Sequence, residues 1–200
     1  MWRLAAVKQV FLVVGLVGIL AFSAPSLALL LRGSKGEAFS ELYILGPGRM
    51  AEGYPFSVKI GQDYSVFVGV VDHLGSAAYY EVQVKLRNAS EPLPNATTGV
   101  WSPLPVLHRF RVFAVDGGTW EDMLSFRLPD VIPGENMSHV GRIVINNITY
   151  DVNKTIVWDA VNNGYYCQIF LELWVYDVVS SGFQYHDRFV GLWLNLTASA

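Results

Sequence analysis

The chain has 200 residues, of which 52% are hydrophobic and only 16% are charged, and its net charge is −3. This length allows one domain, or one domain with an anchor. The acidic balance and the lack of a basic stripe argue against nucleic acid as a partner. Cys167 is the only cysteine, so no intramolecular disulfide can form, and its apolar neighbours predict a buried thiol.

An uncharged apolar run near the N-terminus predicts a membrane span. Val10 to Leu31 contains no charged residue, and a helix of that length covers about 33 Å, against about 30 Å of bilayer hydrocarbon. We therefore expect a cytoplasmic N-terminus at residues 1–8, a transmembrane helix or uncleaved signal anchor in the lipid bilayer at residues 9–31, and a linker at residues 32–38. A cleaved signal peptide is the alternative.

Glycosylation motifs indicate which side of the membrane the rest of the chain occupies. Six of the nine asparagines begin an Asn-x-Ser/Thr motif without proline at the middle position, whereas chance would give about one. Such acceptor sites are used at surface positions on the outer side of a membrane. The sequence therefore predicts a single-pass protein of the cell membrane with an N-glycosylated extracellular C-terminal domain. The expected glycosylation sites are Asn88, Asn95, Asn136, Asn147, Asn153 and Asn195.

Residues 39–200 read as one all-β domain. Short alternating segments are separated by Gly, Pro and Asn turn signals, and no stretch has helical periodicity. This pattern predicts an antiparallel immunoglobulin-like β-sandwich, with a barrel as the alternative. The expected strands are residues 39–45, 56–60, 64–72, 80–87, 106–115, 120–128, 140–152, 154–158, 165–176 and 189–196.

One of these segments makes a specific prediction about burial. Residues 80–87 alternate strictly between apolar and polar side chains, which is typical of a strand with one core face and one solvated face. The proline-rich segment that follows, residues 88–105, is expected to be a loop because its prolines exclude a central strand. Residues 129–135 are also expected to be a loop, before the strand at 140–152.

The residues that could act in catalysis or bind metals do not form a recognisable motif. We therefore expect no catalytic, cofactor-binding or metal site, and a protein that is not an enzyme. The four histidines have no metal-ligand spacing, and the G-x-S-x-G nucleophile motif is absent. His186 and its charged neighbours are expected to be solvated at a turn. Trp174, Tyr176 and Trp193 are candidates for an interaction surface, because exposed aromatic rings stack on sugars or contact proteins.

The stretch from Phe39 to Asn88, followed by EPLPNATT and FRVFAVDGGTWEDMLSF, resembles an uncharacterised archaeal membrane-anchored family, the domain of unknown function 1616. The resemblance is strongest over residues 39–126, and residues 136–163 match less well. It implies a cell-surface protein with a β-rich extracellular part, and it assigns no catalytic residue.

These observations together predict a membrane-anchored, N-glycosylated cell-surface module that binds or scaffolds other envelope or membrane proteins. One alternative is a structural subunit of a surface assembly or filament, in which the N-terminus is cleaved and residues 39–45 are donated as a strand to a neighbour. A surface hydrolase or an accessory subunit of a membrane complex is the third class.

Overall fold

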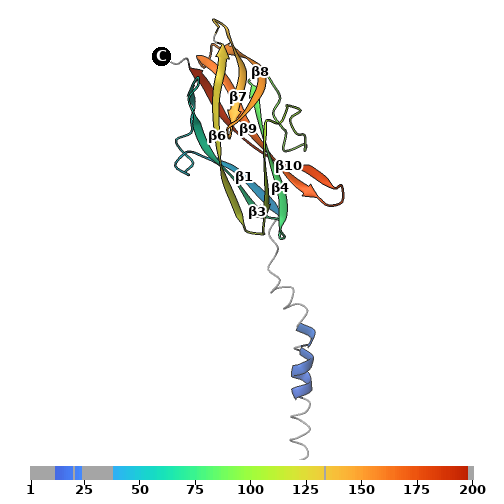
Figure 1. Cartoon of the computed structure of the whole chain (residues 1–200). Helices are drawn as coiled ribbons and strands as arrows, with labels where there is room; N and C mark the ends of the chain where they lie inside the picture. Colours follow the sequence, from blue (N-terminus) through green and yellow to red (C-terminus); the bar gives the residue numbers. More distant parts are fainter. Residues whose placement is uncertain (1–11, 20, 24–37, 133, 198–200) are drawn as a thin grey trace, which may run out of the picture. The chain divides into compact units, whose positions relative to one another are not determined.

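The computed structural model describes residues 12–19, 21–23, 38–132 and 134–197. The chain forms two compact units, Met1–Ala38 and Phe39–Ala200. In the first unit, residues 12–19 and 21–23 are helical (Figure 1). Apolar side chains of this helix, such as Leu12 and Phe22, are exposed. Among the residues described, none belongs to a helix that is long and apolar enough to cross a membrane. The other twelve residues of the expected span, 9–11, 20 and 24–31, lie outside the described ranges, so the span stays a prediction.

The second unit is mostly β-structure, as the sequence predicts. Its described residues form ten strands: β1 (Phe39–Leu45), β2 (Ser57–Lys59), β3 (Tyr64–His73), β4 (Ala78–Asn88), β5 (His108–Ala114), β6 (Thr119–Ile132), β7 (Met137–Ile145), β8 (Ile148–Asp159), β9 (Gly164–Asp177) and β10 (Gly182–Thr197).

The strands form a curled sheet that folds into a two-layer sandwich (Figure 1). One layer has the order β1-β3-β6-β7-β8, and the other has the order β5-β4-β9-β10-β2. The layers join where β8 pairs with the start of β9 at Trp158 and Tyr165. All pairs are antiparallel except one, because β2 runs parallel to β10. The expected antiparallel arrangement therefore holds for every described strand pair except this one.

The hydrophobic core lies between the two layers, where each strand directs alternate side chains inward. Burial of these apolar surfaces is the main favourable contribution to folding. Representative core residues that are fully buried are Val68, Val82, Leu124, Ile143, Leu171 and Leu194. Cys167 belongs to the same core, and burial raises the pKa of its thiol to about 12.

The expected strand boundaries differ most from the structure at three places. Residues 140–152 are not one strand, because Asn146 and Asn147 both have positive φ and turn the chain between β7 and β8. β6 continues to Ile132 through Pro129, and its pairing with β7 is irregular there because proline has no N–H to donate. β10 begins at Gly182, seven residues earlier than expected, and forms a long hairpin with β9.

Candidate binding site

The three aromatic residues expected to form one interaction surface lie in separate surroundings. All three lie on the outer face of the β5-β4-β9-β10-β2 layer. Trp174 is half-buried between Trp101 and Tyr185, at ring-centroid distances of 5.7 and 5.9 Å. Tyr176 and Trp193 are each 38% exposed, but Tyr176 lies near the β9–β10 turn and Trp193 lies on the C-terminal half of β10.

The outer face of β4 is buried, so the expectation that it is solvated is wrong. Its side chains alternate as the sequence predicts, yet none of the outward residues Glu81, Gln83, Lys85 and Arg87 is more than 8% exposed. The loop of residues 89–107 between β4 and β5 contacts Lys85 and Arg87 directly. Arg109 and Arg111 of β5 donate to the Glu81 carboxylate, at 3.2 and 2.9 Å. The pattern of residues 80–87 predicts the two faces correctly but cannot show that a loop covers one of them.

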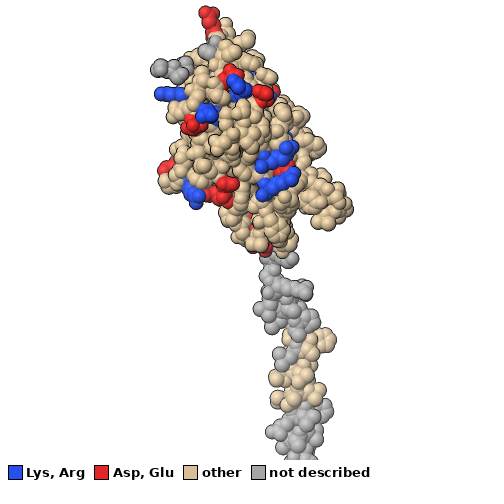
Figure 2. Space-filling model, in the orientation of Figure 1, with Lys and Arg blue, Asp and Glu red and all other residues tan. Residues whose placement is uncertain are grey.

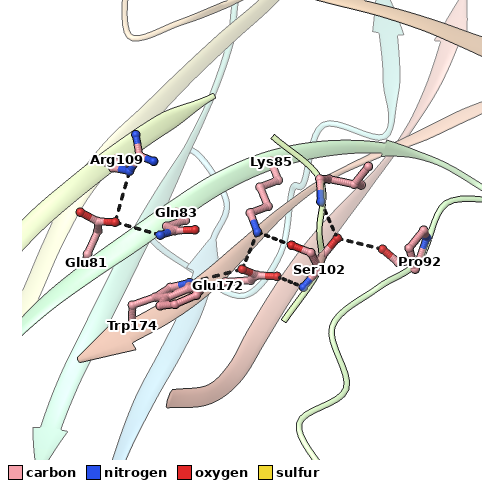
Figure 3. Close-up of polar contacts among 9 residues, drawn as sticks. Glu81, Gln83, Lys85, Pro92, Ser102, Arg109, Glu172 and Trp174 are labelled. Carbon is pink, nitrogen blue, oxygen red and sulfur yellow. Dashed lines mark hydrogen bonds and ion pairs between the residues drawn. The ribbon is translucent and has the colours of Figure 1, made fainter. Parts of the chain in front are cut away.

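A buried ion pair attaches this loop to the sheet (Figure 3). Lys85 Nζ lies 2.7 Å from Glu172 Oε2 and donates a second hydrogen bond of 2.7 Å to the carbonyl oxygen of Ser102. The backbone N–H of Ser102 donates to Glu172 Oε1, also at 2.7 Å. Trp174 Nε1 donates to the same carboxylate at 3.3 Å. Because both charges are matched and hydrogen-bonded, the loop is held at a defined position.

Arg87 extends this attachment to the neighbouring part of the sheet. Its guanidinium donates to Gln168 Oε1 at 3.0 Å and to the carbonyl oxygen of Ala89 at 2.7 Å. The same group lies 5.4 Å from the centroid of the Trp193 ring, within cation–π range. The Trp193 ring is therefore supported from beneath by a residue that is itself fixed.

Two cavities meet at Trp193 and Phe56. The first, of about 380 Å³, is mainly apolar, and the second, of about 370 Å³, is more polar. The first is lined by Ile44, Tyr54, Phe56, Val190, Gly191, Leu192 and Trp193. The second is lined by Phe56, Ala89, Asp159, Asn162, Tyr166 and Trp193. Since both share an exposed tryptophan and an exposed phenylalanine, we call them together the Trp193 groove.

The first cavity lies along an open edge of the sheet. β2 pairs with β10 only at Asn195–Thr197, and no described strand pairs with that side of β10 before Asn195. The N–H of Asn195 points to this side, because it donates to the carbonyl oxygen of Phe56 at 2.7 Å. Main-chain groups alternate in direction along a strand, so those of Gly191 and Trp193 point to the same side. The groove therefore combines an apolar cavity with unpaired main-chain groups.

A serine, a histidine and a tyrosine lie close together elsewhere in the sandwich. These residue types are common in active sites, but here they are not accessible to a substrate. Ser40 Oγ lies 2.7 Å from Tyr80 Oη and 3.1 Å from His186 Nε2. Ser40 is 1% exposed and Tyr80 is fully buried. Burial raises the pKa of Tyr80 to about 12 and lowers the pKa of His186.

A nucleophile must be reachable by its substrate, and this serine is sealed between β1, β4 and β10. The cluster therefore has a structural role. The expectation that His186 is solvated is wrong, because its imidazole contacts the Ser40 hydroxyl. No group of three or more His, Cys, Asp or Glu residues in the described ranges is arranged to hold a metal ion.

The six expected glycosylation sites fall into two groups. Asn95, Asn136, Asn147 and Asn153 are exposed. Asn88 and Asn195 are half-buried: Asn88 Nδ2 donates to the carbonyl oxygen of Thr155 at 3.1 Å, and Asn195 Oδ1 accepts from the N–H of Tyr165 at 3.2 Å. Which of the six sites carry a glycan stays a prediction.

The fold and the groove define a β-sandwich protein with an open sheet edge. A family model described as "Domain of unknown function (DUF1616)" matches residues 33–139, more than half of the chain. The protein therefore belongs to this family, as the resemblance predicted. Its archaeal origin stays a prediction.

No curated protein matches the chain. Among solved structures, a β-glucosidase from Listeria innocua is similar at 10% identity with a TM-score of 0.43, over 82% of this chain and 16% of that chain. The CARDB domain of the PF1109 protein from Pyrococcus furiosus, in complex with di-metal ions, has 9% identity and a TM-score of 0.36, over 80% of this chain and 90% of that chain. The chain thus spans about a sixth of the glucosidase, and neither likeness carries an argument about activity.

Proposed function

We propose that this protein is a membrane-anchored, N-glycosylated module of the cell surface that binds an extended segment of another envelope protein. The segment adds as a strand to the open edge of β10 in the Trp193 groove. The observation that carries this proposal is the unpaired main chain of Gly191 and Trp193 beside an apolar cavity. An unpaired edge of this kind is a template for strand addition.

The composition of the groove favours an extended peptide. Main-chain hydrogen bonds to β10 would supply affinity, and alternate side chains of the peptide would enter the apolar cavity beside Ile44 and Leu192. Phe56 is 48% exposed and Trp193 38%, so these rings provide the large rigid contact area typical of binding hot spots.

Support for the surface address comes from the sequence and from the exposed helical residues. Residues 12–19 and 21–23 expose an apolar helical surface, as an anchor segment would. The six glycosylation motifs favour an extracellular domain. We propose further that the sandwich is immunoglobulin-like, since two mainly antiparallel layers enclose its single core.

Binding is favoured over strand donation by residues 39–45. β1 pairs with β3 along all seven of its residues, from Phe39 opposite His73 to Leu45 opposite Phe67. Donation to a neighbour would break this whole ladder. A non-enzymatic role is favoured because Ser40, the serine placed next to a histidine, is sealed from substrate.

We expect Gly191→Pro to weaken peptide binding about tenfold or more, whereas Gly191→Ala should bind nearly as well as the wild type. Proline removes the N–H that faces the open edge and leaves the β9 ladder intact. Alanine is the matched control, because both variants place a Cβ against the Gln168 side chain, 2.3 Å from Nε2 and 2.9 Å from Cδ, and only proline also removes the N–H. The probe is an array of extended peptides that covers the surface proteins of the same organism, applied to the full chain in nanodiscs.

The pattern of losses separates strand addition from ring stacking. Trp193→Ala should weaken binding in either case. If Gly191→Pro binds as well as Gly191→Ala while Trp193→Ala does not bind, then the ligand stacks on the ring, and strand addition is wrong.

A further inference from the structure

An apolar patch lies at one end of the sandwich, on the outer side of the β5-β4-β9-β10-β2 layer and its turns. We call it the tip patch. Its members are exposed by between 37% and 94%: Tyr79, Phe113, Val115, Tyr176, Val178 and Val179. Tyr79 and Tyr176 each contact the ring of Phe183, at centroid distances of 5.3 and 5.4 Å. The most exposed members are the two valines at the β9–β10 turn, and this projecting hairpin shows no charged side chain at its tip in Figure 2.

The tip patch lies at the end of the sandwich where the chain enters at Phe39. Phe39 pairs with His73 at the end of β3. The adjacent Asp72 exchanges two main-chain hydrogen bonds with the turn after β5: Gly117 N–H donates to its carbonyl oxygen at 2.7 Å, and its own N–H donates to the Gly118 carbonyl oxygen at 3.1 Å. This turn carries Val115. The start of β1 and the tip patch therefore share one end of the domain (Figure 1).

The length of the linker before Phe39 limits how far this end of the domain can lie from the expected anchor. Residues 32–38 separate the uncharged apolar run from β1, and seven residues span at most about 25 Å when fully extended. An anchor formed by residues 9–31 would thus keep the Phe39 end within about 25 Å of the bilayer surface. The bilayer surface would therefore lie within reach of the tip patch, and it could cover these apolar side chains.

We infer that the tip patch docks on the bilayer, with the side chains of Val178 and Val179 inserted among the lipid headgroups and upper acyl chains. This inference rests on the anchor in the proposed function. The residues of the tip patch are arranged as a membrane interface requires. The two valines lie at the turn itself, and Tyr79 and Tyr176 lie behind them on the sheet, where their amphipathic rings would sit at the level of the headgroups.

Two further observations favour a lipid surface. The carboxylate of Asp177 accepts hydrogen bonds from the N–H groups of Val179 and Ser180, at 3.1 and 3.0 Å. These bonds hold the Asp177 carboxylate at the base of the turn. All six glycosylation motifs lie elsewhere in the fold. A glycan at this end would hold the domain away from the lipid.

The test compares two labelled valines at opposite ends of β9. Val179→Cys and Val161→Cys place an environment-sensitive fluorophore on the turn after β9 and on the turn before it, where the wild-type valines are 94% and 91% exposed. Each turn is stabilised by an aspartate, Asp177 or Asp159, whose carboxylate accepts hydrogen bonds from backbone N–H groups of the turn. Cys167 is buried, so it does not compete for the label.

The full chain is reconstituted in phosphatidylcholine vesicles that contain lipid with a nitroxide near the glycerol backbone. We expect the label at position 179 to be quenched at least twofold more than the label at 161, and Val178→Asp should abolish the difference. Equal quenching at the two positions would overturn the inference. Carbonate extraction of the same vesicles separates the two claims: a chain that is extracted refutes the anchor, whereas a retained chain with equal quenching refutes the tip patch alone.

Discussion

Replacing Lys85 with methionine should lower the free energy of unfolding by about 3–5 kcal/mol. Lys85 and Glu172 are 2% and 0% exposed, and the carboxylate would remain in the interior without its cation. The Ser102 carbonyl oxygen would lose its donor as well. Because Ser102 belongs to the loop of residues 89–107, we also expect this loop to become sensitive to protease before the rest of the domain. Urea denaturation and limited proteolysis of the variant provide the measurements.

Arg142→Met is the matched control for this prediction. Arg142 Nε lies 3.1 Å from Asp130 Oδ2, but both side chains are exposed, at 52% and 39%, so solvent screens the pair. The expected cost is about 0–1 kcal/mol. Replacing Lys85 and Glu172 together with methionine should recover part of the loss, since no unpaired buried charge remains. Equal, small effects of Lys85→Met and Arg142→Met would contradict the buried attachment of the loop.

Phe170→Ala should cost about 3–5 kcal/mol of stability, although Phe170 lies on the outer face of its sheet. It pairs with Lys85 across β4 and β9, so the two side chains share this face, and Phe170 is fully buried. Truncation removes apolar contacts and leaves a cavity on this face of the sheet, and both effects lower stability.

Phe113 provides the comparison because it is a phenylalanine on the same outer face, 67% exposed on β5. Phe113→Ala should change stability by no more than about 0.5 kcal/mol. Thermal and urea unfolding of both variants would show a large difference. Two effects of similar size would mean that the loop does not seal the face.

Local patterns in the sequence predict much of the fold, whereas contacts distant in the sequence are not predictable from them. Residues 39–45 form β1 as expected, because a short alternating run ends at a Gly-Pro-Gly turn. The two faces of β4 follow from its alternation. The burial of its polar face does not, since Lys85 and Glu172 are 87 residues apart and the covering loop has no periodic pattern.

The candidate site is predictable only in part for the same reason. Trp193 stands out as an aromatic residue on the face opposite the leucines of its strand. Phe56 carries no such signal, and it joins Trp193 only because β2 returns to pair with the end of β10. Gly191 lies two residues before Trp193 on the same strand, but the sequence does not show that this edge is unpaired. The parallel pairing of a three-residue strand has no sequence signature that could have revealed the open edge beside it.

We propose that this β-sandwich is held on the outer side of a membrane by its own N-terminal segment. Mass spectrometry of the protein purified from the membranes of its own organism tests both the anchor and the sidedness in one measurement. We expect an intact peptide covering residues 10–31 and glycan on exposed motifs such as Asn95 and Asn147. A mature chain that begins after the apolar run, with all six asparagines unmodified, would contradict it.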